Sequence, residues 1–144
     1  MIPYYFLDTN ILIYGVSLAA DHQSKREIAR TWMARGDWGI STQVLMEFSV
    51  NACRPGHGLA KDAVGMFIRE FVDTRPIQGM DARMVVDALE IQSRYALNMW
   101  DAAILAAAKR LGCSQLVSED LNHGQNYAGV VAVNPFLDTP SPAA

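Results

Sequence analysis

Residues 2–10 read IPYYFLDTN, an apolar run that ends at the carboxylate of Asp8. The run predicts a buried strand over residues 4–7. A carboxylate beside a core segment loses hydration, which raises its pKa and destabilises the fold unless a positive group compensates. Asp8 therefore needs a partner that its neighbours in the sequence do not provide.

Three further acids stand in similarly apolar surroundings. They are Glu47 within VLMEFSV (residues 44–50), Asp101 at the start of DAAILA (residues 101–106), and Asp120 after QLVS (residues 115–118). No Lys or Arg adjoins any of the four acids in the sequence, so a bound hard cation is the natural counter-charge. Oxygen ligands without a set of Cys or His indicate Mg²⁺ or Mn²⁺ rather than zinc.

The composition is that of one globular domain. A chain of 144 residues, of which 51% are hydrophobic and 19% charged, can bury a core and is not typical of a disordered protein. We expect one domain over residues 1–136 and a flexible C-terminal tail over residues 137–144. No apolar run approaches the ~20 residues that span a bilayer, and no basic segment precedes the first apolar run, so we expect neither a membrane span nor a secretory signal. Cys53 and Cys113 are predicted to be reduced thiols of a cytoplasmic protein.

The net charge of −3 argues at first against a nucleic-acid partner. Without the four acids, however, 12 basic residues face 15 − 4 = 11 acidic ones, a balance of +1. Neutralising the acids with metal would leave a surface that need not repel phosphate. Four basic residues fall within one short helical stretch, which is either a phosphate-binding patch or, as we favour, a solvated helix face; they are Lys25, Arg26, Arg30 and Arg35.

Short apolar strands alternate with helical patterns along the chain. The predicted strands are residues 4–7, 38–41, 75–78, 115–117 and 130–133, and the predicted helices are residues 11–18, 24–34, 42–52, 59–72, 82–95 and 99–111. This alternation predicts a single-domain α/β fold, a parallel-sheet sandwich with helices on both faces. Ligands gather at the carboxyl ends of strands in such sheets, where Asp8 and Asp120 are expected.

Helical spacing also predicts which apolar side chains share a face. On the helix over residues 82–95 these are Val85, Val86 and Leu89, and on the helix over residues 59–72 they are Leu59, Ala63, Met66, Phe67 and Phe71. Phe67, Ile68 and Phe71 add more apolar surface than a small sheet needs, which suggests self-association.

Each acid also has an ordinary structural interpretation. Asp8 could be a turn residue, with Asn10 capping the next helix. Asp101 could complete a capping box at the start of its own helix, and Asp120, beside Glu119, could lie in a polar turn. A solvated position is hardest to find for Glu47, which has apolar neighbours on both sides in its helix.

Taken together, the four acids indicate a metal-dependent reaction. A divalent ion held by carboxylates can lower the pKa of a water molecule and shield the charge of a phosphodiester. Hydroxyl and amide groups near the acids in sequence, those of Thr9, Asn10 and Ser118, would orient water and phosphate.

Four motifs resemble those of a known family. They are FLDTNILIY (residues 6–14), STQVLMEF (residues 41–48), WDAAI (residues 100–104) and VSEDLN (residues 117–122). In this order, across residues 4–136, they resemble the PIN-domain ribonucleases, most closely the VapC-type toxins of bacterial toxin–antitoxin pairs. One such motif alone would be weak support, whereas four in order are specific.

The resemblance implies a parallel sheet between helices, and Mg²⁺- or Mn²⁺-dependent endonucleolytic cleavage of RNA. It also implies a cognate antitoxin that wraps the protein and blocks its site, and a homodimer of the toxin itself. Matching positions imply four catalytic, metal-binding acids and three supporting polar residues: Asp8, Glu47, Asp101 and Asp120, with Thr9, Asn10 and Ser118. Register with Ser118 favours Asp120 in the fourth position, and the adjacent Glu119 stays an alternative.

Two other functions compete with this one. A haloacid-dehalogenase-like phosphatase has its nucleophile where Asp8 stands, but it expects a second Asp at the position of Asn10 and a Lys in a context that Lys109 does not match. A PIN fold that binds RNA without cutting it is the other rival, although binding alone would not retain a repulsive cluster of carboxylates.

The histidines carry less information. His123 could touch an RNA phosphate or simply be solvated, and we favour solvation. His22 and His57 have no partners at the spacing of metal ligands. Without a His near the acids in sequence, catalysis by an acid–base pair has no support.

Overall fold

The computed structural model describes residues 2–137, so most of the expected tail, residues 138–144, lies outside the described part. Six strands form one sheet in the order β3-β2-β1-β4-β6-β5. Their bounds are β1 Tyr5–Leu7, β2 Trp38–Ser41, β3 Ile77–Gln78, β4 Gln115–Val117, β5 Asn126–Tyr127 and β6 Val130–Val133. All neighbours pair in parallel except β5 and β6, which are antiparallel.

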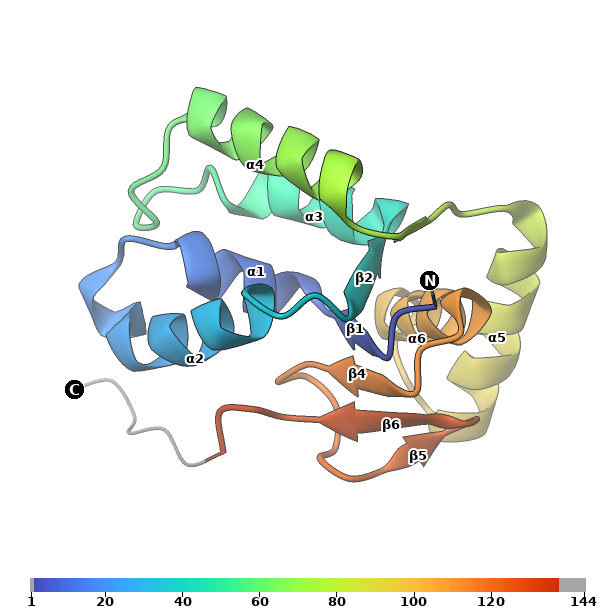
Figure 1. Ribbon diagram of the computed structural model, residues 1–144. Coiled ribbons are helices and arrows are strands. Elements are labelled where there is room, and N and C mark those ends of the chain that lie inside the picture. Colours follow the sequence, from blue (N-terminus) through green and yellow to red (C-terminus); the bar gives the residue numbers. More distant parts are fainter. Residues whose placement is uncertain (1, 138–144) are drawn as a thin grey trace.

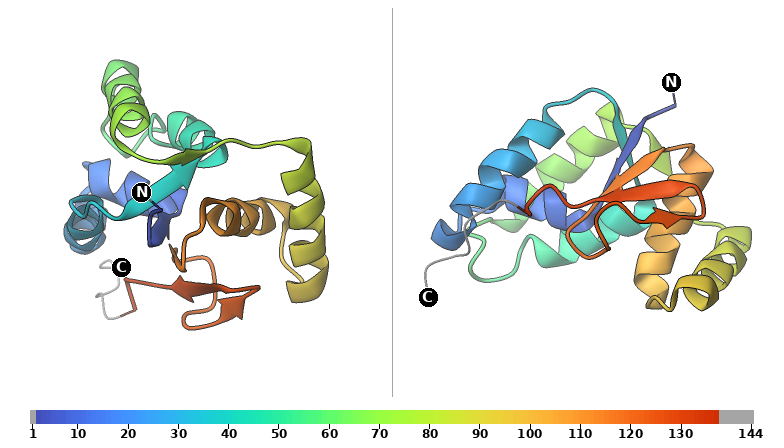
Figure 2. Two further views of the ribbon diagram at one scale, coloured as in Figure 1. Left: turned by 45° about the vertical axis from the view of Figure 1, so that its right-hand side comes forward. Right: turned by 90° about the horizontal axis from the view of Figure 1, so that it is seen from below.

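Helices lie on both sides of this sheet, so the protein has a mostly parallel α/β fold, as the sequence predicts (Figure 1). The helices are α1 Thr9–Val16, α2 Gln23–Met33, α3 Thr42–Asn51, α4 Lys61–Thr74, α5 Ala82–Tyr95 and α6 Met99–Leu111, with a 3₁₀ turn η1 at Ala20–His22. In Figure 2, α1 and α2 lie on one side of the sheet and α5 and α6 on the other, while α3 and α4 lie beyond β2. None of the helices in residues 2–137 is long and apolar enough to cross a bilayer.

The central strand β1 determines where polar residues can gather. It pairs in parallel with β2 on one side and β4 on the other. The first residues after these strands, Asp8, Thr42 and Ser118, therefore lie along one edge of the sheet. The backbone N–H of Asp8 donates to the carbonyl of Val117 at 3.0 Å, which brings the ends of β1 and β4 together.

Helix α1 begins earlier than the sequence predicts. Asp8 itself is the N-cap, and its side chain accepts a hydrogen bond from the backbone N–H of Thr9. Asn10, the cap expected from the sequence, instead lies inside the first turn of the helix, which leaves its side chain available for other partners. Asn98 is the N-cap of α6, because its side chain accepts a hydrogen bond from the backbone N–H of Asp101.

Helix α6 is buried on all sides along most of its length. Residues 102–108 are all buried, and five of the seven are alanines, which let the helix lie close to the sheet on one side and to α5 on the other. Helix α5 packs on α6 with Met84, Ala88 and Ile91. The apolar face expected from Val85, Val86 and Leu89 is instead exposed, because α6 covers only one side of an α5 that carries apolar residues on both.

Other sequence predictions are partly correct. In α4, Phe71 is buried and Phe67 packs against the core, but Met66 is 69% exposed. Phe67, Ile68 and Phe71 are thus engaged within the fold, which removes the sequence-based reason for self-association. Strand β3 is two residues long rather than four, and the short strand β5 was not expected. Both thiols are free as predicted, Cys113 being buried and Cys53 half-buried.

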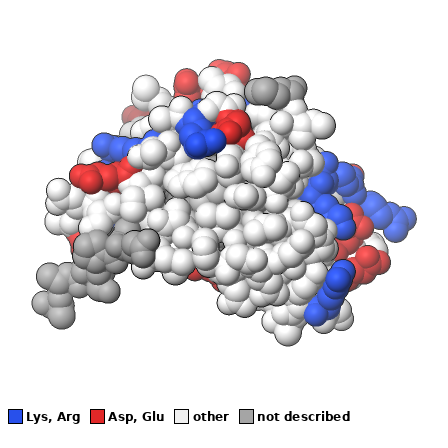
Figure 3. Space-filling view, turned by 60° about the horizontal axis from the view of Figure 1, so that its bottom comes forward, with Lys and Arg blue, Asp and Glu red and all other residues white. Residues whose placement is uncertain are grey.

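Charged side chains are unevenly distributed. Seen from the side of β6, much of the surface carries no charged group, and Lys and Arg gather with Asp and Glu at the end where α5 lies (Figure 3). Among them, Arg110 of α6 forms ion pairs with Asp81 and Asp87 at 3.1 and 3.2 Å. Two acids therefore balance Arg110 at this end.

The packing of α5 and α6 predicts a large loss of stability for one leucine substitution and a small loss for another. Leu105 is fully buried, and Leu105→Ala should lower the free energy of unfolding by about 2–5 kcal/mol, because it leaves a cavity beneath the sheet. Leu89 is 51% exposed, and Leu89→Ala should cost less than about 1 kcal/mol at a protein concentration too low for self-association. Urea unfolding of both variants gives the comparison. Equal losses would contradict the described burial of the two helices.

Candidate functional site

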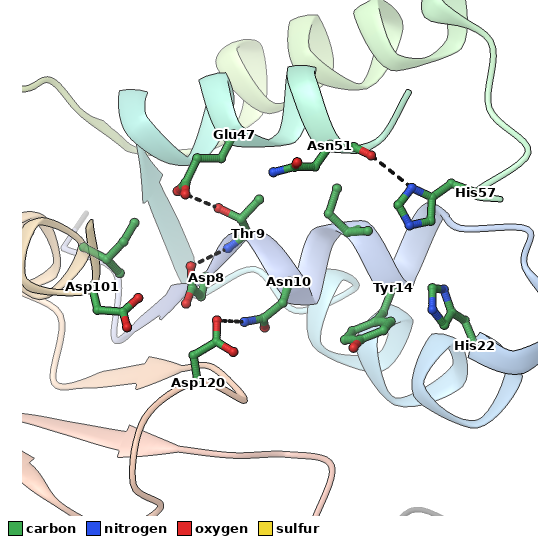
Figure 4. Close-up of a pocket in the computed structure, with 12 residues that line it drawn as sticks. Asp8, Thr9, Asn10, Tyr14, His22, Glu47, Asn51, His57, Asp101 and Asp120 are labelled. Carbon is green, nitrogen blue, oxygen red and sulfur yellow. Dashed lines mark hydrogen bonds between the residues drawn. The ribbon is translucent and has the colours of Figure 1, made fainter. Parts of the chain in front are cut away.

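A cavity of about 350 Å³ opens at the carboxyl ends of β1 and β4 (Figure 4). All four acids that the sequence singled out line it, two of them following strands and two coming from α3 and the first turn of α6. The lining residues are Asp8, Thr9, Asn10, Ile13, Tyr14, His22, Glu47, Asn51, His57, Asp101, Ile104 and Asp120. No Lys or Arg is among them.

Asp8 is the most buried of the acids, with 6% of its surface exposed. Its Oδ1 accepts from the backbone N–H of Thr9, and its Oδ2 accepts from the hydroxyl of Ser118, both at 2.7 Å. Burial, together with the smaller effect of the charges of Asp120 and Glu47, raises the pKa of Asp8 to about 7 against the opposing effect of these two hydrogen bonds. Two neutral hydrogen-bond donors do not offset the free-energy cost of burying a charged carboxylate.

Glu47 projects from α3 toward the same cavity. Its Oε1 accepts from the Thr9 hydroxyl at 3.1 Å and from the Gln43 amide at 3.4 Å. Partial burial raises the pKa of Glu47, as do the charges of Asp101 and Asp120, while the two hydrogen bonds lower it. The hydrogen bond from Thr9 joins the start of α1 to the middle of α3, which holds Glu47 near the end of β1.

Asp101 takes part in the cap of α6 that the sequence suggested, and it also lies at the cavity. Its backbone N–H donates to the Asn98 side chain at 2.9 Å, and its Oδ2 accepts from the Asn98 amide at 2.9 Å, so it takes part in the cap of α6. It also lines the cavity. Burial raises the pKa of Asp101, followed by the charge of Asp120, and the Asn98 hydrogen bond lowers it. The capping interaction thus holds the carboxylate at the cavity.

Ser118 and Asn10 connect Asp8 to Asp120. The Ser118 hydroxyl donates to Asp8 and accepts from the backbone N–H of Asp120 at 3.1 Å. The Asn10 amide donates to Asp120 Oδ2 at 3.1 Å and to Ser118 Oγ at 3.4 Å. The other end of that amide, Asn10 Oδ1, is buried without a hydrogen-bond partner among the described residues. It is an oxygen ready to accept a bond from water or to ligate a cation.

Glu119, the alternative for the fourth acid, does not line the cavity. It accepts from the Tyr14 hydroxyl at 2.6 Å and forms an ion pair with Lys25 at 2.8 Å. The geometry therefore brings Asp120, and not Glu119, together with the other three acids.

Each member of the basic cluster considered from the sequence is engaged with another group of the protein. Lys25 holds Glu119, Arg26 donates to the carbonyls of residues 17 and 19, Arg30 donates to the carbonyl of Gly15, and Arg35 pairs with Asp37. The contacts of Arg26 and Arg30 hold α2 against α1 and the loop that follows α1. They favour a structural role over the phosphate-binding patch considered from the sequence.

The donor set suits a hard divalent cation. Three of the acids have raised pKa values, no Lys or Arg is among the lining residues, and Asn10 offers an unpartnered oxygen. Within residues 2–137, no three Asp, Glu, His or Cys side chains are already gathered tightly enough to hold an ion alone. An ion here would keep water molecules among its ligands, as Mg²⁺ usually does.

Two histidines that line the cavity, His22 and His57, were not expected at the site, because neither has a partner at metal-ligand spacing in the sequence. They are 35 positions apart in sequence, yet their ring centroids lie 5.8 Å apart. His123, the histidine considered for phosphate contact, accepts from the backbone N–H of Asn134 through Nδ1 at 3.0 Å and does not line the cavity. The only local signal for His57 is the pair of flanking glycines in RPGHG (residues 54–58).

Comparison with known proteins gives a consistent family. The family described as PIN domain matches residues 5–128. No curated protein matches the chain.

Solved structures of similar fold come from toxin–antitoxin systems. A toxin–antitoxin complex from Klebsiella pneumoniae is 25% identical, with a TM-score of 0.64 over 91% of this chain and 97% of that one. DNA-bound VapBC from Salmonella typhimurium is 20% identical, with a TM-score of 0.65 over 92% and 97%. VapC20 from Mycobacterium tuberculosis, a toxin that cleaves the sarcin–ricin loop, is 20% identical, with a TM-score of 0.60 over 78% and 86%.

The buried carboxyl of Asp8 predicts a pH-dependent effect of Asp8→Asn. The pKa of Asp8 is about 7 in the folded protein and lower in the unfolded chain, so the unfolded chain loses the proton first and stability falls as the pH rises between these values. Asn does not ionise. Relative to the natural protein, the variant should therefore gain up to about 2.5 kcal/mol in unfolding free energy between pH 5 and pH 8 without metal.

Urea unfolding in a chelating buffer at the two pH values measures this gain. Asp73→Asn is the matched control, because Asp73 is an exposed acid of α4 that does not line the cavity. A gain that stays constant with pH in Asp8→Asn would contradict the burial of an uncompensated carboxylate.

Proposed function

The chain belongs to the PIN-domain family, and from that premise we propose that it is a Mg²⁺- or Mn²⁺-dependent endoribonuclease, the toxin of a toxin–antitoxin pair. One observation carries the proposal. Four carboxylates from distant parts of the chain line one cavity that no Lys or Arg enters. Such a group of acids is tolerated when a cation is bound among them.

Asp8, Glu47, Asp101 and Asp120 would hold the ion. When bound, it supplies a water of lowered pKa and neutralises negative charge on the phosphodiester. The protein contributes the positions of the oxygens. The hydrogen bonds from Ser118 and Thr9 hold Asp8 in one orientation, and both donors to Glu47 reach the same oxygen, Oε1. Pre-positioned ligands reduce the reorganisation that binding would otherwise require.

The supporting polar residues have distinct parts in this proposal. Thr9 orients Glu47, and Ser118 orients Asp8 and the backbone of Asp120. Asn10 holds Asp120 through its amide N–H and offers Oδ1 to water or to the ion. Each of these groups is neutral, so the negative charge of the site remains available to the cation.

The role as a toxin is supported by the structural neighbours, several of which were solved in complexes of a toxin with its antitoxin, some with DNA. By analogy, we propose a cognate antitoxin as partner and RNA as substrate. Self-association is proposed on a different basis from the aromatic residues considered in the sequence. It rests on the exposed apolar side chains of α5, Val85, Val86 and Leu89.

The two rival functions are tested differently. The phosphatase alternative loses its basis with the family assignment, since it belongs to another family. A PIN domain that binds RNA without cutting it would keep the fold but not the metal. Calorimetric titration with Mg²⁺ or Mn²⁺ that detects no binding would favour it over the nuclease.

Cleavage should depend on single carboxylates. Asp8→Asn and Asp101→Asn each remove one charged ligand, and each should lower the rate of Mn²⁺-dependent RNA cleavage by more than ~100-fold, since loss of groups that merely orient metal ligands already costs 10–100-fold. Chelation should abolish cleavage by the natural protein. Gel analysis of total RNA measures the rate, and sequencing of the fragments identifies the cut sites.

Two controls accompany that experiment. Asp73→Asn, which changes an exposed acid outside the cavity, should cleave normally. Circular dichroism should show that both inactive variants keep the helical content of the natural protein. Undiminished cleavage by Asp8→Asn and Asp101→Asn would rule out the proposed mechanism.

Self-association is checked by sedimentation. The natural protein should sediment as a dimer at micromolar concentration, and Leu89→Asp should shift it toward the monomer, because a charge is costly inside an apolar interface. Met66→Asp, a change of another exposed apolar residue on α4, is the matched control for this face. A monomeric natural protein would contradict the proposal.

A further inference from the structure

The cavity has two chemically different ends. Its acidic end holds Asp8, Glu47, Asp101 and Asp120, and its histidine end holds His22 and His57 with Tyr14 and Asn51. Figure 4 shows the two imidazole rings beside each other, beyond Tyr14 from the acids. They come from separate segments, His22 from the end of η1 and His57 from the loop between α3 and α4.

His57 is held in a defined orientation. Its Nδ1 lies 3.0 Å from the carbonyl oxygen of Asn51, and because a carbonyl only accepts, Nδ1 must carry the proton. Its backbone carbonyl accepts from the N–H of Leu18 at 2.7 Å, which docks the loop beside η1. Gly56 and Gly58 on either side have φ of 101° and 77°, a left-handed backbone that glycine adopts without strain. These contacts occupy Nδ1 and leave Nε2 for a ligand.

His22 is oriented in a similar way. Its Nδ1 lies 2.9 Å from the Ser17 hydroxyl, and its ring meets the Tyr14 ring edge-on, with centroids 4.9 Å apart. Its Nε2 is again the nitrogen outside these contacts. The two rings lie 5.8 Å apart, and both side chains are half-buried. Two imidazoles with their Nδ1 atoms engaged and their Nε2 atoms unused are therefore presented together at the end of the cavity.

The rest of the cavity offers a polyanion no positive group. Lys25, the ammonium nearest in sequence to His22, is held by Glu119 and Tyr14. Arg26 and Arg30 are bound to backbone carbonyls. On the side of β6, basic residues gather at the α5 end together with acids (Figure 3). Among the residues that line the cavity, His22 and His57 are the only ones whose side chains can carry positive charge.

We propose that His22 and His57 form a subsite that binds an RNA backbone phosphate next to the one cleaved at the acidic end. The inference rests on the proposed nuclease function and extends it. A single-stranded RNA backbone places successive phosphates along its length. With Nδ1 held by its protein partner, Nε2 donates to a phosphate oxygen when the ring is the imidazolium, which carries a proton on both nitrogens and is favoured beside an anion. The acidic end would engage one phosphate through the cation, and the histidine end the neighbouring phosphate directly. The two histidines would thus position the substrate without taking part in the chemistry.

Paired substitutions separate this role from a structural one. In His22→Asn and His57→Asn, the amide lies near the former Nδ1 and can keep the contact to Ser17 or Asn51, but nothing replaces Nε2. In His22→Gln and His57→Gln, the amide reaches toward the former Nε2 position and gives up the Nδ1 contact. A phosphate subsite is damaged more by Asn, whereas a purely structural role is damaged more by Gln.

Cleavage kinetics give the first measurement. With a short single-stranded RNA and Mn²⁺, each Asn variant should raise KM roughly tenfold, the value of one hydrogen bond to a charged group, while kcat stays unchanged. The Gln variants should raise KM less. A fall in kcat at constant KM, or larger effects of Gln than of Asn, would overturn the subsite.

Direct binding gives the second measurement and does not require activity. Fluorescence anisotropy with a labelled 12-nucleotide single-stranded RNA of random sequence, in the Asp101→Asn background, should show a Kd roughly tenfold higher for each added Asn substitution. Unchanged RNA affinity would overturn the proposal. If the natural protein does not cleave RNA at all, the nuclease function fails, and this binding series still decides whether the histidines contact RNA.

Discussion

The placement of one carboxylate, that of Asp8, constrains most of this molecule. The central strand β1 carries it into the interior, and parallel pairing with β4 brings Ser118 to within 2.7 Å of it. The same side chain begins helix α1 by accepting from the N–H of Thr9. Burial raises its pKa to about 7, so without a cation the fold holds an acid that resists ionisation. Stability of the fold and capacity for a cation are therefore opposed at this residue.

The other acids are positioned by neutral groups rather than by cations. Thr9 connects α1 to Glu47, Asn10 and Ser118 connect α1 and β4 to Asp120, and Asn98 holds Asp101. An arginine or lysine in any of these places would fix the geometry equally well, but it would neutralise the charge. Glu119 illustrates the difference, because Lys25 pairs with it and it lies outside the cavity. Hydroxyl and amide partners keep the carboxylates both oriented and attractive to a divalent ion.

The scarcity of positive groups at the cavity also explains why it has an acidic end and a histidine end. A substrate with many phosphates meets four acids, which a bound cation can offset locally but not along the whole strand. Arg26 and Arg30 of α2 already hold α2 to α1 and to the loop that follows α1, and Lys25 pairs with Glu119. Among residues 2–137, only the loop after α3 and the turn η1 bring groups to the cavity that can carry positive charge. This arrangement gives the two loops a part in recognition, where loops often act in α/β proteins.

The sequence by itself determined the alternation of strands and helices, the parallel sheet and the acids expected at its carboxyl edge. These features depend on local apolar periodicity and on the shared direction of parallel strands, both of which are written in short segments. The predicted start of α1 was two residues too late. Asp8 and Asn10 are both good N-cap residues, and the contacts of Asp8 with Val117 and Ser118 at the end of β4 place Asp8 at the cap. Tertiary structure alone decided which face of α5 is buried, since Met84 and Leu89 both lie in apolar patterns and only packing against α6 distinguishes them. It also decided that Glu119 pairs with Lys25 and that His22 meets His57, because such pairings join segments whose separation along the chain carries no information about their distance in space.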